Sequence, residues 1–510
     1  MNRRDFIKGA TAAGVLAALP WRRASAQGGI PPGGTMASDV KRYLEAFGVT
    51  EQDIRAVMGV ALSRSGDFCD LFFQSTVTNS VGLEDNVVNR AGCAAEMGVG
   101  IRVVKGDQTG YSYCEEISLQ AMKAAAATAA AIADGPASPA VPEMAVQSLP
   151  SFYPAQTPWS EVGVDSKVPL LQRVNDRMRG ADPRIIKATV SMVDQASRML
   201  VARSDGRMAA DDQPLARFTA ACIAEHQGRR EQNYFDVSAR AGFELFTPAL
   251  LDRVADEAVR STLALFDAVK PDGGEMPVVL AAGSSGILLH EAIGHGMEAD
   301  FNRKKISIFC DKVGKPVARK FVSIVDDGTV AANRGAINVD DEGNDTEKTW
   351  LVQDGILTGY LHDRISATHY RVKPTGSGRR QSFRFAPQPR MRNTYMLPGP
   401  HSRDEIIASV KKGLYAETFT NGQVLIGGGD FTFYVKSGFL IEDGKLTKPV
   451  KDINIIGNGP KVLEQITMVG DDLQFSEGGW TCGKNGQGVP VSMGLPTVLV
   501  SSATVGGSNG

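Results

Sequence analysis

The chain lacks the features typical of membrane-anchored and nucleic-acid-binding proteins. Its apolar run near the N-terminus, residues 9–20, is about a dozen residues long, whereas a membrane-spanning helix needs ~20. Its 55 Lys and Arg residues are offset by 57 Asp and Glu, so the net charge is −2 and there is no basic excess. These absences predict no stable membrane anchor and no nucleic-acid partner.

Cysteine is also scarce, and its arrangement excludes a compact disulfide framework. The 510 residues include six cysteines and no C-x-x-C motif. A chain of this length buries enough apolar surface without disulfides, so five of the six are predicted to be mostly free, buried thiols. The cysteines are Cys69, Cys93, Cys114, Cys222, Cys310 and Cys482.

Motifs for two other chemistries are incomplete. Residues 283–286 precede a predicted helix but lack the G-x-S-x-G form of a serine hydrolase, so we expect no serine nucleophile. The acidic run at 340–345 misses the spacing of an EF-hand loop and is better explained as a solvated turn.

Histidine is scarce too, yet two of the six histidines fall in one hexapeptide, His290-Glu291-Ala292-Ile293-Gly294-His295. Two imidazoles beside a carboxylate are typical of a catalytic zinc site, in which the carboxylate takes a proton from water. On a regular helix the histidines, five positions apart, would diverge by about 140°. Both reach one metal only if the helix has a π-type bulge or ends between them, and Gly294 makes either distortion cheap.

A third ligand must come from elsewhere in the chain. Cys482 is the candidate, because its glycine-rich segment, residues 478–488, forms a loop that approaches a metal closely, and thiolate is a good zinc ligand. Glu298, three residues past His295, is an alternative ligand from the next turn, as is Asp300. Glu298 is otherwise a carboxylate that orients a ligand histidine.

This combination, together with several later segments, resembles the TldD/PmbA (TldD/TldE) metallopeptidases and specifically their catalytic TldD type. The similar segments are G-R-R-Q-S at 378–382, P-R-M-R-N-T-Y-M at 389–396, I-G-N-G-P at 456–460 and M-V-G-D-D-L at 468–473. The likeness extends from about residue 70 to about residue 500. It implies one zinc ion per chain, held by His290, His295 and Cys482, with Glu291 as general base.

The resemblance implies zinc-dependent hydrolysis of unfolded or extended peptides, in which Glu291 accepts a proton from a zinc-bound water. Candidate substrate-binding residues are Arg379, Arg380, Tyr395 and His369. It also implies a TldE-like partner subunit or a homodimer. The alternative is a noncatalytic peptide-binding or scaffold subunit that has kept a structural metal.

The N-terminus has the pattern of a twin-arginine signal peptide, residues 1–26. Asn2-Arg3-Arg4-Asp5-Phe6 precedes the apolar run, and Ala24-Ser25-Ala26 has the small-x-small form of a cleavage site. Its removal takes away five Lys or Arg and one Asp, which moves the net charge from −2 to −6. We therefore expect export by the twin-arginine pathway to a periplasmic or extracytoplasmic location.

The remaining sequence predicts an α+β fold in several parts. These are a mixed N-terminal domain (45–135), a proline-rich linker (136–159), a mixed central domain (160–272) and a β-rich C-terminal domain (273–507) that carries the zinc-site helix.

Within these parts, local patterns predict individual elements. Alanine-rich residues 121–133 predict a helix, as do residues 250–268, while 189–193 and 199–202 are strand-like. Two Asp-Gly pairs, at 354–355 and 443–444, predict hairpins. We expect such hairpins to stack into a sandwich or barrel-like sheet that brings the two histidines and the cysteine together.

Overall fold

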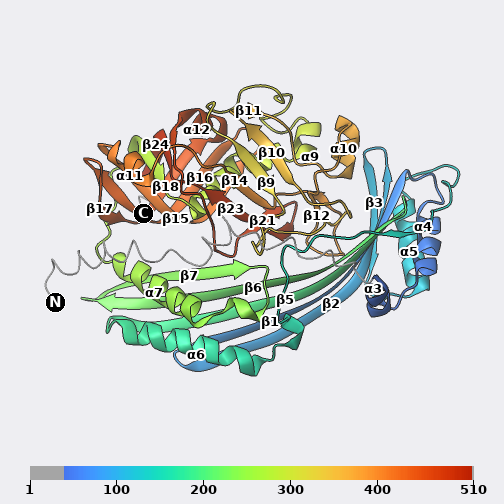
Figure 1. Ribbon diagram of the computed structural model, residues 1–510, viewed down its shortest axis with the longest axis horizontal. Helices are drawn as coiled ribbons and strands as arrows, with labels where there is room; N and C mark the ends of the chain where they lie inside the picture. The colour runs from blue at the N-terminus through green and yellow to red at the C-terminus, as the bar shows by residue number, and fades with distance from the viewer. Residues whose placement is uncertain (1–39, 508–510) are drawn as a thin grey trace.

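The structure is a computed structural model that describes residues 40–507, so the predicted signal peptide lies outside the described residues. The described chain forms two layers. One is a long, curved sheet with helices on its outer face, and the other is a β-rich C-terminal body packed against the inner face (Figure 1).

The first layer contains a seven-stranded sheet in the order β3-β2-β1-β5-β6-β4, with β7 also paired to β6. Its strands are antiparallel except for the β4–β6 pair. The strands are β1 (Phe68–Glu84), β2 (Val87–Lys105), β3 (Gln108–Cys114), β4 (Ala145–Val146), β5 (Ile185–Arg203), β6 (Arg207–His226) and β7 (Arg229–Ala239). The helices are α3 (Val40–Phe47), α4 (Glu51–Ala61), α5 (Leu119–Ala130), α6 (Val164–Ala181) and α7 (Pro248–Ala264).

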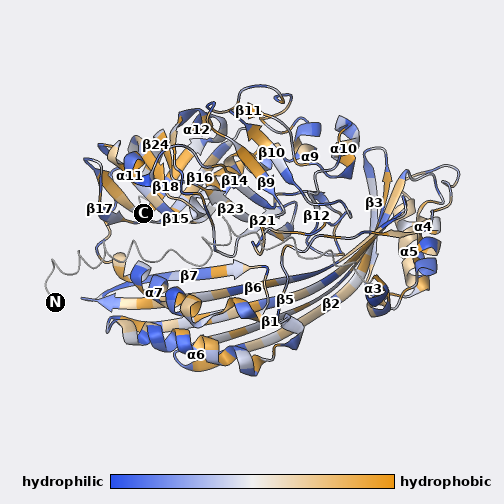
Figure 2. Ribbon diagram, viewed as in Figure 1, coloured by the Kyte–Doolittle hydropathy of each residue, from blue (hydrophilic) through white to orange (hydrophobic). Residues whose placement is uncertain are grey.

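Alternating burial along the strands explains why helices cover one face. In β6 every second residue from Ala216 to Ala224 is buried, and these side chains form a core with α6 and α7. Figure 2 shows hydrophobic and hydrophilic residues alternating along both helices, as expected of helices with one buried face. A second core lies under α3, α4 and α5 at the other end of the sheet.

The local predictions for this layer are partly confirmed. Helices occur in the alanine-rich stretch (α5) and near residues 250–268 (α7). The two strand-like stretches at 189–193 and 199–202 are confirmed as strand, and the structure joins them in the single 19-residue strand β5. The residues between them, 194–198, are mostly polar, yet they continue the strand because β5 pairs on both sides throughout this region.

The C-terminal body is built on a closed barrel. Strands β15-β8-β24-β18-β16 follow one another, and β15 pairs with β16 to close the ring. This confirms both the mixed α and β fold class and the barrel-like sheet. The strands are β8 (Gly274–Leu280), β15 (Lys412–Leu425), β16 (Asp430–Glu442), β18 (Ile453–Asn458) and β24 (Val498–Gly507), with β17 (Lys445–Val450) and β19 (Ile466–Val469) paired to the ring.

A second sheet in this body has the order β11-β10-β9-β14-β23-β20. Both Asp-Gly pairs form two-residue turns with left-handed backbone, one between β10 and β11 and one between β16 and β17, as predicted. The sheet strands are β9 (Ile324–Asp327), β10 (Lys348–Gln353), β11 (Ile356–Leu357), β14 (Asn393–Met396), β20 (Gln474–Phe475) and β23 (Ser492–Leu495). Two small hairpin pairs are β12 (Gly378–Arg379) with β13 (Gln388–Pro389), and β21 (Thr481–Lys484) with β22 (Gln487–Pro490). The helices are α8 (Ile287–Leu289), α9 (Ala299–Arg303), α10 (Arg364–Tyr370), α11 (Arg403–Ala408) and α12 (Gly459–Gln465).

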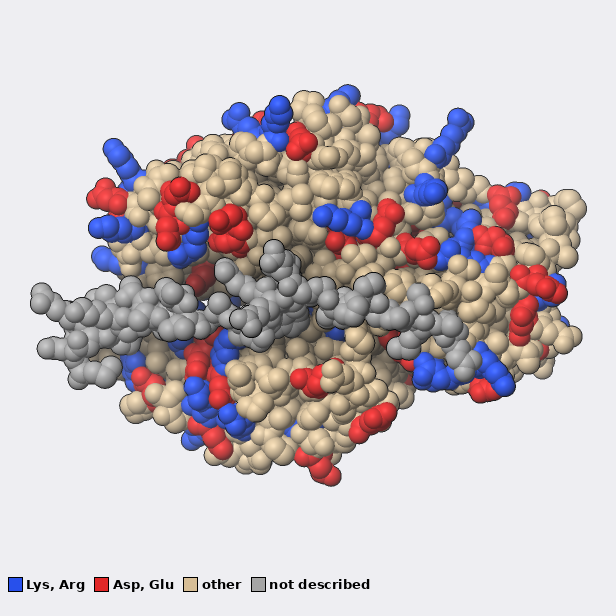
Figure 3. Space-filling model, in the orientation of Figure 1, with Lys and Arg blue, Asp and Glu red and all other residues tan. Residues whose placement is uncertain are grey.

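Charges of both signs are interspersed on the face shown in Figure 3. Over the parts of that face formed by described residues, no large area carries a single sign.

Candidate metal centre

The two histidines of the 290–295 segment lie on a distorted helix. After α8, residues 290–294 form a π-helical turn in which the backbone N–H of His295 donates to the carbonyl of His290. A π turn joins residues i and i+5, so the two side chains come to the same side. Their ring centroids lie 5.0 Å apart. Of the two predicted distortions, a π-type bulge or a helix end, the structure shows the π-type bulge.

The turn needs glycine at position 294 because its backbone packs closely against Met391. Its φ is −58°, an ordinary helical value, so left-handed freedom is not what the position needs. A Cβ at Gly294 would lie 2.0 Å from Sδ of Met391, whose side chain is fully buried. Only a residue without a side chain fits between the turn and Met391.

The third candidate ligand comes from the hairpin of β21 and β22. Cys482 lies in β21, opposite Val489. The Arg390 guanidinium donates to the Cys482 carbonyl, and Arg334 donates to the Trp480 carbonyl at 2.8 Å. Two buried arginines therefore fix the backbone on either side of the thiol.

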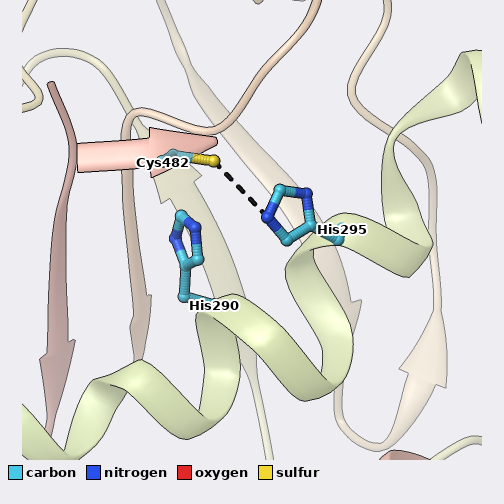
Figure 4. A group of neighbouring side chains, drawn as sticks. All are labelled: His290, His295 and Cys482. Carbon is cyan, nitrogen blue, oxygen red and sulfur yellow. Dashed lines mark hydrogen bonds between the residues drawn. The ribbon is translucent and has the colours of Figure 1, made fainter. Parts of the chain in front are cut away.

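The structure brings the histidines and the cysteine into one buried group, although 187 positions separate His295 from Cys482 (Figure 4). One ligand atom from each of His290, His295 and Cys482 lies within 4.8 Å of the others. Cys482 Sγ is 3.4 Å from Nε2 of His295. Nδ1 of His290 is buried and has no hydrogen-bond partner among the described residues, as expected of a site that a further group completes.

Electrostatics in this group favour the metal-binding form of the thiol. Burial alone would raise the pKa of Cys482, but the neighbouring His295 and His290 hold that pKa well below its usual value. Burial alone would lower the pKa of His295, but Cys482 and Glu298 raise that pKa well above its usual range. A thiolate and two imidazoles form a donor set that suits Zn²⁺.

Glu298, the alternative ligand, instead contacts Nδ1 of His295, the ring nitrogen that is not directed at Cys482. Its Oε2 is 3.0 Å from Nδ1 of His295, which leaves Nε2 directed at Cys482. Burial would raise the pKa of Glu298, but Lys484, His295 and Arg390 lower it to about 2. Lys484 Nζ is 3.1 Å from the carboxylate, which is fully buried. This geometry matches a carboxylate that orients a ligand histidine.

Asp300, the other alternative, also lies outside the group. Lys484 Nζ donates to its Oδ1 at 2.7 Å, so the same lysine links the two acidic side chains.

Glu291 lies at the edge of a cavity beside the histidines. Its Oε2 is 4.0 Å from His295 Nε2, and its side chain is 17% exposed. Burial raises the pKa of Glu291 above its usual value. The cavity has a volume of about 270 Å³ and is lined by Ile287, His290, Glu291, Thr420, Gly422, Trp480, Thr481, Val491 and Met493.

The two arginines predicted to bind substrate have other partners. Arg379 is buried and donates to the carbonyls of Met391 and Pro490. Arg380 is also buried and lies 3.3 Å from Asp70 of β1. Neither lines the cavity beside Glu291.

The other two predicted substrate residues are equally separate from that cavity. Tyr395 is buried, and its hydroxyl donates to Asp327 at 3.1 Å. His369 is exposed near the end of α10. A substrate-binding role for these four residues stays a prediction without a supporting contact.

Three residues that position the group were not singled out from the sequence, namely Arg390, Lys484 and Arg334. Arg390 and Lys484 lie inside the motif segments at 389–396 and 478–488, so their place in those segments could have indicated a role at the site. Arg334 lies far from both segments in the sequence, and only its contacts in the fold reveal it.

Comparison with protein families places this group in a metallopeptidase framework. Residues 69–133 match PmbA/TldA metallopeptidase domain 1, residues 157–266 match the central domain and residues 273–507 match the C-terminal domain. The matches define a protein of the metallopeptidase class. The chain belongs to the PmbA/TldD metallopeptidase family.

Similar curated proteins support this assignment along most of the chain. The chain is 38% identical over 468 residues to the metalloprotease TldD homolog of Haemophilus influenzae, which covers 90% of this chain and 97% of that protein. It is 36% identical over 472 residues to the homolog of Buchnera aphidicola from Acyrthosiphon pisum, covering 91% and 98%. A zinc metalloprotease TldD homolog of Saccharolobus solfataricus is 35% identical over 238 residues, covering 46% and 53%.

Solved structures share the fold. TldE from Thermococcus kodakarensis has a TM-score of 0.70 and 17% identity, covering 90% of this chain and 99% of its own. A putative modulator of a DNA gyrase from Thermotoga maritima has a TM-score of 0.71 and 20% identity, covering 86% and 96%. At these identities the likeness concerns the fold alone.

The N-terminal prediction is also supported by comparison. Residues 1–20 match the twin-arginine translocation signal sequence, as predicted. Among residues 40–507, no helix is both long enough and apolar enough to cross a membrane.

Proposed function

We propose that this chain is a zinc metallopeptidase of the HExxxH type that hydrolyses unfolded or extended peptides. The observation that carries the proposal is the convergence of His290, His295 and Cys482 within 4.8 Å, beside a cavity that Glu291 lines. Three protein ligands leave a coordination position open, which is the pattern of a catalytic rather than a structural zinc site.

The residues present fit one zinc ion per chain. Ligands at ~2.0–2.3 Å from a tetrahedral zinc lie roughly 3.5 Å apart, and the Sγ–Nε2 distance of 3.4 Å agrees with that spacing. Held by these three side chains, zinc would act as a Lewis acid and would lower the pKa of a bound water toward about 7.

Glu291 performs the proton transfers in this proposal. Its raised pKa brings the carboxylate closer to the range in which it can accept a proton from the attacking water and return it to the leaving amine. Glu298 keeps His295 in the tautomer with the proton on Nδ1, so Nε2 is free to act as a ligand.

An extended peptide is the substrate form that we propose, and the shape of the cavity supports it. The cavity of about 270 Å³ holds only a short part of a peptide, so the rest of the chain must extend beyond it. Trp480 and Met493 offer apolar contacts there, and Thr420 and Thr481 offer polar ones.

The test compares Glu291→Gln with Cys482→Ser. In Glu291→Gln we expect peptide hydrolysis to fall by at least about 10²-fold while roughly one zinc per chain is retained, because the base is lost but no ligand is. In Cys482→Ser we expect both zinc and activity to fall. Zinc content is measured by mass spectrometry and hydrolysis with unfolded peptides.

Glu298→Gln is the matched control for the third ligand. If Cys482 is the ligand, Glu298→Gln retains zinc, although with reduced affinity. If Cys482→Ser keeps its zinc and Glu298→Gln loses it, the proposed ligand set is wrong. If the parent binds zinc but hydrolyses no peptide, the alternative of a noncatalytic scaffold subunit with a structural metal is favoured.

We also propose that the twin-arginine signal directs the chain to the periplasm or another extracytoplasmic location. The match over residues 1–20 supports this. Replacement of Arg3 and Arg4 by Lys should retain the protein in the cytoplasm, as measured by cell fractionation.

A further inference from the structure

Most buried arginines of this chain have a carboxylate partner, and three of them have none. Eight arginines are buried among the described residues. Five lie within 4.0 Å of a carboxylate oxygen, namely Arg102, Arg203, Arg380, Arg390 and Arg392. Within residues 40–507, no ion pair is formed by Arg240, Arg334 or Arg379. A buried charge without a counterion is costly, so these three side chains need an explanation.

Arg334 joins the long sheet to the wall of the cavity beside Glu291. Its Nη1 donates to the Ser238 hydroxyl of β7 at 2.6 Å, and its Nε donates to the Trp480 carbonyl at 2.8 Å. Its Nη2 is 3.4 Å from Oγ1 of Thr481. Trp480 and Thr481 both line the cavity, in the part of the C-terminal body that faces the end of β7 (Figure 1). The bond of Nη2 is the longest of the three, so this N–H is available to a stronger acceptor.

Arg240 and Arg379 have only weak or uncharged acceptors. Arg240 directly follows β7, and its Nε has no hydrogen-bond partner among the described residues. Its Nη1 is 3.5 Å from Oε1 of Gln213, which is at the limit of a hydrogen bond. Arg379 donates to two backbone carbonyls, which carry no net charge.

The three arginines are close enough to act on one another. Burial, followed by the charges of Arg217 and Arg240, lowers the pKa of Arg334 to about 9. Burial and the charge of Arg240 lower the pKa of Arg379 to about 10. Both side chains are still charged at neutral pH, so the three arginines form one cluster of positive charge.

The nearby carboxylates do not neutralise this cluster. Four of them act on it, namely Asp211, Asp236, Asp326 and Asp341. Asp236 and Asp326 are ion-paired to arginines outside the cluster, at 2.8 and 2.7 Å. Asp211 and Asp341 accept hydrogen bonds from neutral donors. Three guanidiniums therefore face two carboxylates that no other arginine pairs with, and one positive charge is left over.

We propose that Arg334 and Thr481 bind one carboxylate of the peptide substrate, supplied by its C-terminus or by an acidic side chain. The Arg334 Nη2–H and the Thr481 hydroxyl donate to that carboxylate, and the positive charge of Arg240 and Arg379 attracts it. Guanidinium is suited to this role because its charge-assisted bonds to carboxylates are short and strong. The inference rests on the proposed peptidase function and names a preference of the same site.

The position of the carboxylate site fixes where the substrate is cut. Thr481 directly precedes Cys482, so the site lies next to the metal centre. A peptide bound there is held at two points, by its carboxylate at Arg334 and by the scissile bond beside Glu291. We therefore expect cleavage at a constant number of residues from the carboxylate.

The first test measures hydrolysis of two matched peptide pairs by the full chain. One pair has no acidic side chain and ends in either a carboxylate or an amide. The other pair ends in an amide and contains either Glu or Gln, at a position that is moved along the peptide. We expect kcat/KM to be about tenfold or more higher for the charged member of one pair. That pair identifies the source of the carboxylate, and mass spectrometry identifies the bond cleaved.

The second test removes the two proposed donors. In Arg334→Met and in Thr481→Val we expect the preference for the charged peptide to fall to about threefold or less. The readout is the ratio within a pair, because a distorted cavity or a partly unfolded chain lowers both rates alike. Thr481→Val keeps the shape of the side chain and loses only the hydroxyl. Arg230→Gln, at an exposed ion pair of β7, is the control and should keep the parent's ratio.

A third test asks whether the charge of Arg240 is unpaired in the free protein. Arg240→Met should leave the midpoint of thermal unfolding unchanged or raise it, because it removes a buried charge without a counterion. Arg392→Met is the matched control and should lower the midpoint, because Arg392 is buried and paired with Asp326. Equal losses in the two variants would show that Arg240 has a counterion and would overturn the charge argument.

The inference and the proposed function fail in different ways. Hydrolysis of both members of each pair at equal rates would overturn the carboxylate site and leave the peptidase function intact. Binding of the same peptides to Glu291→Gln, followed by fluorescence polarisation of an N-terminal label, covers the opposite case. Tighter binding of the charged peptide without any hydrolysis by the parent would support the site and contradict the peptidase function.

Discussion

Gly294 shows how one residue without a side chain decides the shape of the metal centre. The π turn brings His290 and His295 to one side only if the backbone passes close to Met391. The sequence suggested that backbone freedom was the reason for glycine here. The structure instead gives a steric reason, because the φ of Gly294 is ordinary and the space is filled.

We therefore predict that Gly294→Ala reduces both stability and zinc content. The added methyl group meets the buried Met391 sulfur, and such overpacking costs about 1–3 kcal/mol. Chemical denaturation measures the stability, and mass spectrometry measures the metal. Gly59→Ala is the control, since Gly59 lies in α4 with open space around its Cα and alanine there should stabilise by up to about 1 kcal/mol. Unchanged zinc content in Gly294→Ala would contradict the steric explanation.

At the level of elements, short turns determine how the barrel strands connect. The β16–β17 hairpin turns on Asp443 and Gly444, with φ values of 48° and 73°. This left-handed pair matches the twist of antiparallel strands, which is why Asp-Gly is a strong hairpin signal. The turn also packs tightly, because a Cβ at Gly444 would lie 2.8 Å from the carbonyl oxygen of Ala408 in α11.

Gly444→Ala should consequently lower the free energy of unfolding by about 1–3 kcal/mol. Left-handed backbone alone costs a non-glycine residue roughly 1–2 kcal/mol, and the contact with α11 adds to it. Asp443→Asn tests the turn without that contact and should change stability by less than about 0.5 kcal/mol, since asparagine tolerates the same conformation. Urea denaturation at neutral pH measures the unfolding free energy of both variants. An equal loss of stability in Gly444→Ala and Asp443→Asn would refute this account.

At the level of the whole molecule, buried polar groups join the two layers. Arg102 of β2 pairs with Glu342 of the C-terminal body at 2.6 Å, and both side chains are fully buried. The prediction of a solvated turn at 340–345 is therefore wrong for Glu342, because this ion pair makes its burial possible. Asp211 of β6 accepts a hydrogen bond from Asn338 of that body at 2.9 Å, and Tyr153 also donates to it. Such groups fix the relative position of the layers because separation would break these buried hydrogen bonds between them.

The buried Asp211 predicts a pH dependence of stability. Burial raises its pKa to about 6, although bonds from Tyr153 and Asn338 oppose the shift. The folded state therefore holds this proton more tightly than the unfolded state, whose pKa is about 3.9. The contribution is fully present below about pH 4 and is lost as pH rises through about 6, by up to about 3 kcal/mol.

Comparison of the parent with Asp211→Asn over pH 4 to 7 isolates this contribution. The difference in unfolding free energy between the two should change in that interval and be constant above it. A pH-independent difference would show that Asp211 titrates normally in the fold.

The sequence anticipated some elements better than others. The Asp-Gly turns and the alanine-rich helix were recognised because their signals are local. Only two parts of strand β5 were recognised, because its middle is polar, and pairing on both edges is what continues the strand through that middle. Burial of Arg379 and Arg380 could not be foreseen, because charged residues are usually exposed and only partners distant in sequence make their burial possible.

The sequence by itself determined the mixed fold class, the hairpins of the C-terminal part and the need for a distorted histidine helix, since spacing and turn chemistry act within a few residues. The tertiary structure alone decided which distant groups meet. It brought Cys482 to the histidines, and it placed the Glu298 carboxylate next to Nδ1 of His295. The physical reason is that such contacts depend on how strands register and layers pack, and these are properties of the whole chain.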